Sequence, residues 1–321
     1  MVNQNFECID AGSEYCPCYL AETKDCLICS HLQGKEFCDC NWNGVCVYQE
    51  FYWLNEKKKG IRETIEAQIV NKKLIGSDIL ILTIKVNKTL ARQLMQPGSY
   101  IFIRDPNQPF FFDVPMSIMR VNKEKATIDV AIQILGAKTK KLLDCGEKVL
   151  LKGPFWNGLL GLKHLKRLKE ENVLVIARGI ALAPALLVIE YLLSRKNNVT
   201  FMMDPGKTGK IFIEDYLRDL DIEVLRVNLR SDEGLAMIRN FLAHGEYSVV
   251  YSGGSDKVHS RIWNQIKDSG KDVQFVITNN GKLCCGEGVC GSCSLKLRDG
   301  LPVKMCKTQL EAETFIGGRY S

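Results

Sequence analysis

The chain has 321 residues, of which 46% are hydrophobic and 25% are charged, and its formal net charge is +6. This length and hydrophobic content are sufficient for two ordinary domains and a small extra region, with cores that need no disulfides. The basic residues are dispersed and their excess is mild, which excludes the strongly positive surface of a nucleic-acid-binding protein.

The N-terminal sequence and the longest apolar stretch bear on localisation. The chain begins MVNQNFECID, which lacks the basic and then apolar pattern of a signal peptide. Residues 179–193, GIALAPALLVIEYLL, are interrupted by Pro184 and Glu190, so we predict a buried helix there and no membrane span. We therefore expect a cytoplasmic protein.

The fourteen cysteines are unevenly distributed. Eight lie between Cys8 and Cys46, five lie between Cys284 and Cys306, and Cys145 stands alone. Clustered thiols in a reducing compartment bind metal more often than they form disulfides. Because the chain has only four histidines, we expect thiolate ligands at any metal centre.

Two kinds of strand pattern follow one another between the cysteine-rich regions. β-Branched segments separated by turn residues predict an antiparallel barrel or sandwich. From about residue 155, short apolar segments alternate with stretches of helical length, which is typical of βαβ units on a parallel sheet. We expect a multidomain chain with a Cys-rich metal-binding region at 1–55, a β-barrel at 60–153, an α/β nucleotide-type domain at 154–279 and a cluster-binding tail at 280–321.

The tail carries the most specific motif. Its ligand candidates have the spacing C-x4-C-x2-C-x12-C, which matches the plant-type pattern that holds a [2Fe-2S] cluster. A four-cysteine zinc site is the alternative, but such sites usually show two short C-x2-4-C pairs. The predicted ligands are Cys285, Cys290, Cys293 and Cys306.

Residues around these cysteines support the same interpretation. Gly286, Gly288 and Gly291 allow the backbone to curl tightly around a cluster. The LRDG turn at 297–300 would return the chain to the fourth ligand. Cys284 is out of register, and we expect it to be a nonligand thiol.

The N-terminal cysteines form two sets of four along a segment of roughly 50 residues that has few large aliphatic side chains. Such a segment cannot bury enough apolar surface to fold alone, whereas a structural metal contributes about 10–16 kcal/mol. Iron–sulfur, zinc and reactive or disulfide-forming thiols all remain open, and His31 is expected to be a surface histidine. The predicted ligands are Cys8, Cys16, Cys18, Cys26, Cys29, Cys38, Cys40 and Cys46.

The order of barrel, nucleotide-type domain and C-terminal [2Fe-2S] loop resembles a known family over roughly residues 60–312. It is similar to the electron-transfer subunit of NAD-linked dihydroorotate dehydrogenase and to the small subunit of NADH-dependent ferredoxin:NADP oxidoreductase. Both belong to the ferredoxin-reductase-like superfamily. The resemblance implies FAD on the barrel and leaves only the N-terminal region without a counterpart.

The resemblance also implies flavin contacts. DVPMSI at 113–118 looks like the strand that lies against the isoalloxazine ring, and IQILGAKTKKL at 132–142 looks like the strand and turn that approach the FAD pyrophosphate. The implied residues are Pro115, Met116, Ser117, Ile132, Gln133, Ile134, Gly136, Lys138 and Thr139.

The flavin strand departs from the family pattern because Asp113 stands where an arginine is usual. Loss of one charge-assisted hydrogen bond costs about 1.5–3 kcal/mol, so FAD binding would be weakened without being abolished. Lys138 or Lys140 could supply the charge instead. The alternative is a barrel that has lost its flavin.

The nicotinamide motif departs further. VIARGIALAP at 175–184 resembles a glycine-rich turn, but Ala177, Arg178 and Ala181 replace glycines, although an arginine could itself reach a phosphate. YSGGSD at 251–256 replaces the family's C-G-P. NAD(P)H is therefore a candidate cofactor, and a degenerate or partner-contacting site is the alternative. The implied residues are Gly179, Ala181, Pro184, Gly253 and Gly254.

The resemblance therefore implies an iron–sulfur flavoprotein subunit of an oxidoreductase. Such a subunit would pass electrons between FAD, the [2Fe-2S] cluster and a catalytic subunit or ferredoxin, and no residue would act as general acid or nucleophile. The alternative is a noncatalytic scaffold or assembly module on a degenerate reductase fold, with zinc in the N-terminal region.

Overall fold

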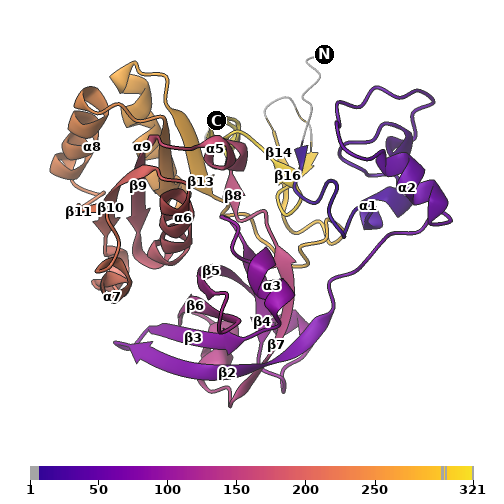
Figure 1. Cartoon of the computed structure of the whole chain (residues 1–321), viewed down its shortest axis with the longest axis horizontal. Helices are drawn as coiled ribbons and strands as arrows, with labels where there is room; N and C mark the ends of the chain where they lie inside the picture. Colours follow the sequence, from indigo (N-terminus) through magenta and orange to yellow (C-terminus); the bar gives the residue numbers. More distant parts are fainter. Residues whose placement is uncertain (1–6, 298–299, 301, 320–321) are drawn as a thin grey trace. The chain divides into compact units, whose positions relative to one another are not determined.

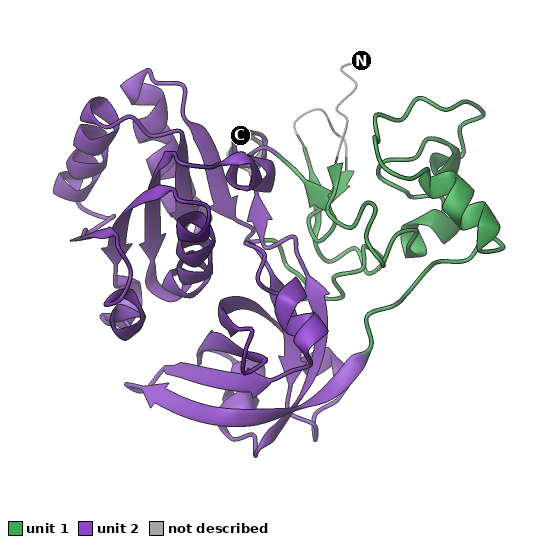
Figure 2. Ribbon diagram, viewed as in Figure 1, with its two compact units in different colours: residues 1–63, 281–310 green, residues 64–280, 311–321 purple. Residues whose placement is uncertain are grey.

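The computed structural model describes residues 7–297, 300 and 302–319. The chain divides into two compact units, shown in Figure 2. The first unit comprises residues 1–63 and 281–310, and the second comprises residues 64–280 and 311–321. The N-terminal cysteine-rich region and most of the tail therefore share one unit.

The second unit contains a closed antiparallel barrel with the strand order β2-β3-β6-β5-β4-β7 (Figure 1). Alternate side chains of a strand face the interior, and Ile128, Val130 and Ile132 are fully buried in this way. The predicted antiparallel barrel is confirmed. Its strands are β2 (Thr64–Ile75), β3 (Ile79–Lys85), β4 (Tyr100–Arg104), β5 (Val114–Asn122), β6 (Thr127–Gln133) and β7 (Lys148–Phe155).

Short helices connect these barrel strands. Asn87 begins the first of them by accepting a hydrogen bond from the backbone N–H of Leu90 at 2.8 Å. The helices are α3 (Lys88–Gln93), the 3-10 helix η2 (Phe110–Phe112) and α4 (Ala137–Leu143).

The second unit also contains a six-stranded sheet with the order β11-β10-β9-β12-β13-β8. Its strands are parallel except for β8, which pairs antiparallel with β13. The predicted βαβ architecture is therefore confirmed. The strands are β8 (Leu159–Leu160), β9 (Asn172–Arg178), β10 (Asn198–Asp204), β11 (Glu223–Arg226), β12 (Val249–Gly253) and β13 (Gln274–Thr278).

Helices connect the strands of this sheet, and the strand order reverses between β9 and β12. In open α/β sheets the crevice at such a switch point is where ligands bind. The connecting helices are α5 (Leu162–Arg167), η3 (Gly179–Ala181), α6 (Leu182–Ser194), η4 (Gly206–Thr208), α7 (Glu214–Leu217), α8 (Asp232–His244) and α9 (Asp256–Ser269). A further helix, α10 (Ala312–Arg319), follows β16.

Helix α6 contains most of the apolar run predicted to be a buried helix, and that prediction is confirmed. Eight of its residues are buried, and it contacts β5 of the barrel as well as β9 and β10 of the sheet. Arg120 of β5 and Glu190 of α6 form an ion pair at 2.8 Å. Within the described ranges, no helix is long and apolar enough to cross a membrane.

The first unit consists mainly of short elements. β1 pairs antiparallel with β16, which places Cys8 opposite Thr308, and β14 pairs with β15 as a hairpin. Residues 298–299 of the predicted LRDG turn lie outside the described residues. The elements are β1 (Glu7–Cys8), α1 (Tyr19–Glu22), η1 (His31–Gln33), α2 (Val47–Trp53), β14 (Ser294–Lys296), β15 (Pro302–Lys304) and β16 (Thr308–Gln309).

Candidate functional site

The residues predicted to contact a flavin ring lie on β5, at the wall that β5 shares with β4. Pro115 pairs with Phe102, and Ser117 pairs with Tyr100. Pro115 is exposed, whereas Met116 and Ser117 are half-buried. Met116 packs against the barrel core, so the barrel presents Pro115 and Ser117, and not Met116, on its outer side.

The predicted pyrophosphate turn follows β6. Ile132 is buried, and Gln133 and Ile134 are half-buried. The Thr139 hydroxyl accepts hydrogen bonds from the N–H groups of Leu135 at 3.0 Å and Gly136 at 3.2 Å.

Those bonds fix the turn between β6 and α4. Gly136 itself is exposed, and a Cβ atom on it would meet no atom within 4 Å. Space for a ligand is therefore present at the turn.

Two cations approach Asp113, the position where the family has arginine. Arg104, at the end of β4, donates through Nη1 to the Asp113 carboxylate at 2.6 Å. Lys138 donates from Nζ to the Asp113 backbone oxygen at 3.1 Å. The Nε atom of Arg104 is buried and has no hydrogen-bond partner within the described part of the chain. Positive charge is thus supplied from β4 and α4.

Sequence reasoning named Lys138 and missed Arg104. Arg104 closes an ordinary strand segment, SYIFIRD, and nothing in that segment indicates a ligand. Only the pairing of β4 with β5 brings its guanidinium to Asp113.

At the predicted nicotinamide turn, which follows β9, the side chain of Arg178 is engaged by another residue of the protein. Arg178 forms an ion pair with Asp204 at the end of β10, and both side chains are largely buried. The Asp204 carboxylate also accepts hydrogen bonds from the N–H groups of Gly206 at 2.7 Å and Leu229 at 2.8 Å. The arginine that could have reached a phosphate is therefore already paired.

The crevice between β9 and β12 is narrow. A Cβ atom on Gly253 would lie 3.2 Å from the Ala181 backbone oxygen and 3.3 Å from its Cβ. Gly179 has φ +61°. The next loop lies close to it, because a Cβ atom on Gly206 would be 3.0 Å from the Cα of Gly179. Pro184 is half-buried in the first turn of α6. The structure therefore places Ala181 and Gly253 side by side, so close that little space is left between them.

A buried hydrogen-bond network lies at the ends of β12 and β13. His259 is fully buried, with Nδ1 2.8 Å from the Ser252 hydroxyl and Nε2 3.1 Å from the Thr278 hydroxyl. Thr278 in turn bonds Gly254, whose N–H donates to its hydroxyl at 3.3 Å. Burial lowers the pKa of His259 to about 4, against an opposing effect of Asp256. The network fixes the backbone of the GGS turn.

The sulfurs predicted to bind the [2Fe-2S] cluster interact with one another. Hydrogen bonding with Cys306 lowers the pKa of Cys285 and that of Cys293, and the same bonds raise the pKa of Cys306. Cys285 also hydrogen-bonds Cys290 and accepts from the Glu287 N–H at 3.3 Å. The structure therefore brings the four predicted ligands together.

The backbone around these sulfurs has the predicted form. Gly286, Gly288 and Gly291 have φ values of +71°, +80° and +73°, a region that side-chain-bearing residues rarely adopt. The hairpin of β14 and β15 returns the chain, and the Met305 N–H bonds the Cys293 oxygen at 3.2 Å. Cys284 is exposed.

The eight N-terminal cysteines lie in the first unit, with no disulfide among the described residues. Burial, with a smaller effect of the neighbouring cysteines, raises the pKa of Cys16 to about 12 and that of Cys26 to about 11. The sulfurs of Cys38 and Cys40 are 3.8 Å apart. Residues 7–297, 300 and 302–319 contain no group of three or more His, Cys, Asp or Glu side chains arranged to hold a single metal ion.

A closed ring of four buried charges joins the N-terminal region to the cluster loop. Arg62 donates to Asp10 at 2.8 Å and to Glu287 at 3.1 Å, and Lys307 donates to the same two carboxylates at 2.5 Å and 3.1 Å. The Arg62 guanidinium also lies 3.9 Å from the centre of the Tyr15 ring. The charges alternate in sign, so each is neutralised by two neighbours.

No sequence pattern indicated this ring. Along the chain, Arg62 is 52 residues from Asp10 and 225 residues from Glu287. Lys307 is 297 residues from Asp10. Glu287 lies between two predicted cluster ligands, and Lys307 follows a third. The ring therefore places the N-terminal region next to the predicted cluster.

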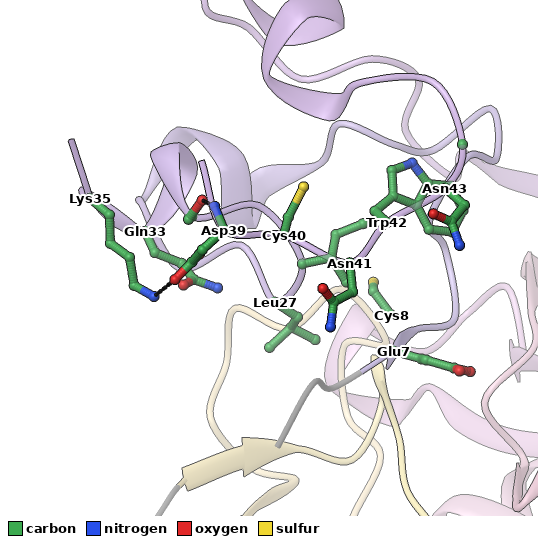
Figure 3. Close-up of a pocket in the computed structure, with 13 residues that line it drawn as sticks. Glu7, Cys8, Leu27, Gln33, Lys35, Asp39, Cys40, Asn41, Trp42 and Asn43 are labelled. Atoms are coloured by element: carbon green, nitrogen blue, oxygen red, sulfur yellow. Dashed lines mark hydrogen bonds and ion pairs between the residues drawn. The ribbon is translucent and has the colours of Figure 1, made fainter. Parts of the chain in front are cut away.

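The first unit also has a pocket of about 730 Å³. Figure 3 shows that its labelled side chains include Cys8 of β1, Cys40 and Trp42. Lys35 and Asp39 form an ion pair at 2.8 Å in the pocket wall. The N-terminal region is thus not closely packed on this side.

No family model matches the sequence. The electron transfer subunit of dihydroorotate dehydrogenase B (NAD(+)) from Shouchella clausii (strain KSM-K16) is 23% identical over 220 residues, which cover 66% of this chain and 81% of that protein. The subunit of the same name from Caldanaerobacter subterraneus subsp. tengcongensis is 22% identical over 241 residues, which cover 74% of this chain and 91% of that protein.

Solved structures show the same likeness. A chain of the NADH-dependent reduced ferredoxin-NADP oxidoreductase aligns with a TM-score of 0.64 and 17% identity over 79% of this chain and 91% of that chain. The ferredoxin reductase in carbazole 1,9a-dioxygenase aligns with a TM-score of 0.52 and 14% identity over 66% of this chain and 68% of that chain. The fold is therefore ferredoxin-reductase-like, and the predicted resemblance is confirmed.

Proposed function

We propose that this chain, which is distantly homologous to the electron transfer subunits of dihydroorotate dehydrogenase B, is itself an electron-transfer subunit of an oxidoreductase. It would hold FAD on the barrel and a [2Fe-2S] cluster in the tail. Its partner would be a catalytic subunit or a ferredoxin, and the substrate would belong to that partner.

The observation that carries this proposal is the meeting of the four tail sulfurs. Cys285 hydrogen-bonds Cys290 and Cys306, and Cys293 hydrogen-bonds Cys306, so the four sulfurs lie close enough to share one cluster. The glycine-rich loop provides N–H groups near these sulfurs, as the bond from Glu287 to Cys285 illustrates. A cluster bound there would supply one-electron transfer.

The barrel residues fit a flavin. Pro115 and Ser117 are accessible for contact with the ring, whereas Met116 packs against the barrel core. Lys138, which bonds only the backbone oxygen of Asp113, would provide the positive charge that the missing arginine would have given to the pyrophosphate, whereas Arg104 is already paired with the Asp113 carboxylate. These residues would bind and orient FAD, and the flavin would supply two-electron chemistry when bound.

The nicotinamide turn does not fit a dinucleotide. Arg178 is paired with Asp204, and Ala181 closes against Gly253 at the switch point. A Cβ at the position of a phosphate-facing glycine obstructs close approach of the backbone. We therefore propose that the electron donor is a protein partner and not NAD(P)H.

The test is anaerobic purification of the full chain, followed by measurement of flavin, iron and absorbance. The wild-type chain is expected to contain FAD and iron. Cys285→Ser is expected to lose the [2Fe-2S] spectrum and keep the flavin, whereas the neighbouring Cys284→Ser is expected to keep both. Absence of flavin and iron from the wild-type chain would refute the proposal.

A noncatalytic scaffold is the second candidate function. The ion pair of Arg178 with Asp204 favours it, because a self-filled crevice needs no cofactor. Stoichiometric zinc and no flavin in the same anaerobic sample would support the scaffold. Reduction of a bound flavin by a protein donor would exclude it.

A further inference from the structure

The ring of four buried charges lies beside the predicted [2Fe-2S] ligands. Glu287 is two residues beyond Cys285, and Lys307 directly follows Cys306. The other two members come from the N-terminal segment, which the family resemblance does not cover. The ring therefore connects this extra segment to the loop that is predicted to hold the cluster. Its members are Asp10, Arg62, Glu287 and Lys307.

The four charged side chains are shielded from water. Those of Lys307, Arg62 and Asp10 are 0%, 1% and 2% exposed, and that of Glu287 is 10% exposed. Burying an ion costs several kcal/mol, and well-packed apolar side chains of similar volume are often as stable as a buried ion pair or more stable. Stability alone therefore does not account for charges at these positions.

Backbone contacts tie the same residues to the predicted cluster loop. The Glu287 N–H donates to the Cys285 sulfur at 3.3 Å, and the Lys307 oxygen accepts a hydrogen bond at 2.9 Å from the residue that follows β1. Leu20 of α1 is buried against the loop, since a Cβ atom on Gly288 would be 3.1 Å from its Cδ1. The N-terminal segment thus packs directly on this loop.

The ring is electrically neutral as a whole, because two cations alternate with two carboxylates. Solvent and salt screen a buried charge much less than an exposed one. The reduction potential of an iron–sulfur cluster depends on the net charge around it and on the hydrogen bonds to its sulfurs. Reduction adds one electron, so an extra positive charge nearby favours the reduced cluster and an extra negative charge opposes it.

We infer that this ring positions the cluster loop and sets the reduction potential of the [2Fe-2S] cluster, so that the N-terminal segment tunes electron transfer at the tail. The four members act as positioning residues, and none of them ligates iron. The inference rests on the proposed function, because it requires a cluster on the four tail cysteines.

The test is an anaerobic redox titration of the purified full chain, with the reduced cluster measured by electron paramagnetic resonance. Asp10→Asn and Glu287→Gln each remove one negative charge with little change of shape, and both are expected to raise the midpoint potential. Arg62→Met and Lys307→Met each remove one positive charge, and both are expected to lower it. The sign of the shift follows the charge that is removed.

Two further variants separate charge from packing. The double variant Arg62→Met with Asp10→Asn leaves the ring neutral, and its potential is expected to return towards that of the wild type. Arg62→Lys changes the hydrogen-bond geometry but keeps the charge, and its potential is expected to stay near the wild-type value. If the ring only held the fold together, the double variant would be the most affected.

Lys304→Met is the matched control. Lys304 is two residues before Cys306, but its side chain is 27% exposed and pairs with Asp25 at 3.6 Å. Because solvent screens this charge, its removal is expected to shift the midpoint potential less than removal of the Lys307 charge.

Three results would overturn the inference. One is a set of midpoint potentials equal to that of the wild type. Another is a shift in the same direction for the carboxylate and the cation variants, and the third is loss of iron from both kinds of variant whatever the charge removed. In each case the wild-type cluster would still be present, so the proposed function would stand. A wild-type chain without iron would instead refute the proposed function and this inference together.

Discussion

Arg104 and Lys138 stand beside Asp113, where the flavin strand lacks its expected arginine. Arg104 at the end of β4 is paired with the Asp113 carboxylate, whereas Lys138 in the first turn of α4 bonds only the backbone oxygen of Asp113. A charge need not come from the same position in the sequence if it reaches the same place in space. The departure in the motif therefore does not argue against a flavin.

Lys138→Ala is expected to weaken FAD binding about tenfold. This is near the lower end for loss of a charge-assisted hydrogen bond, because Lys138 is exposed. Flavin fluorescence titration of the apoprotein measures the affinity. Lys140→Ala is the control, and equal weakening in the two variants would show that Lys138 has no specific role.

His259 makes the stability of the α/β sheet depend on pH. The folded chain keeps this histidine neutral down to about pH 4, whereas an unfolded chain protonates it near pH 6.5. Its contribution is complete above about pH 6.5 and is lost as the pH falls towards 4, because acid favours the unfolded state.

The expected slope from this one residue is about 1.4 kcal/mol per pH unit within that range. Urea unfolding of the wild type and of His259→Gln, from pH 7 to pH 4.5, measures it. The variant is expected to show the shallower dependence. Parallel curves for the two proteins would contradict the assignment.

At the scale of elements, the buried charge ring joins the end of β1, the segment before β2, the cluster loop and the start of β16. These segments are short and bury little apolar surface themselves. Because removal of one partner leaves an uncompensated buried charge, the ring makes the position of each segment depend on the others.

Arg62→Met is expected to destabilise the first unit by about 3–5 kcal/mol, since Asp10 and Glu287 would lose a shared buried partner. Urea unfolding followed by far-UV circular dichroism measures the change. Lys304→Met is the control, because Lys304 pairs with Asp25 at 3.6 Å near the surface and such pairs contribute about 1 kcal/mol or less. Similar small effects in both variants would contradict a structural role for the ring.

At the scale of the whole molecule, the chain combines an antiparallel barrel with a nucleotide-type sheet, and we propose that the barrel holds a flavin. Arg178 and Asp204 neutralise each other at the edge where a dinucleotide would lie. Helix α6 contacts both the barrel and the sheet. The electron donor is accordingly expected to be a protein.

The flavin is expected to remain oxidised when NADH or NADPH is added to the anaerobic chain. Dithionite, which needs no binding site, is expected to reduce it fully and serves as the control. Absorbance at the flavin band measures both reactions. Stoichiometric bleaching by NADH would show that the crevice opens and that the nicotinamide assignment from the resemblance is correct.

The features that could be predicted from the sequence are those that depend on residues close together in the chain. The alternating apolar pattern of β6 and the alternation of strands with helices predicted the barrel and the sheet, because burial repeats every second residue on a strand. The tail cysteines were predicted as a set, and the structure brings them together, although their role as cluster ligands stays a prediction.

The sequence alone determined the fold class and the tail thiols because both depend on spacing within a short stretch of chain. Tertiary structure alone decided three matters: the cations at Asp113, the pairing of Arg178 with Asp204, and the ring of buried charges that includes Lys307 and Asp10. Each depends on residues that only strand pairing or loop packing brings together. Lys307 and Asp10, 297 residues apart and in contact at 2.5 Å, show why no local pattern reveals such neighbours.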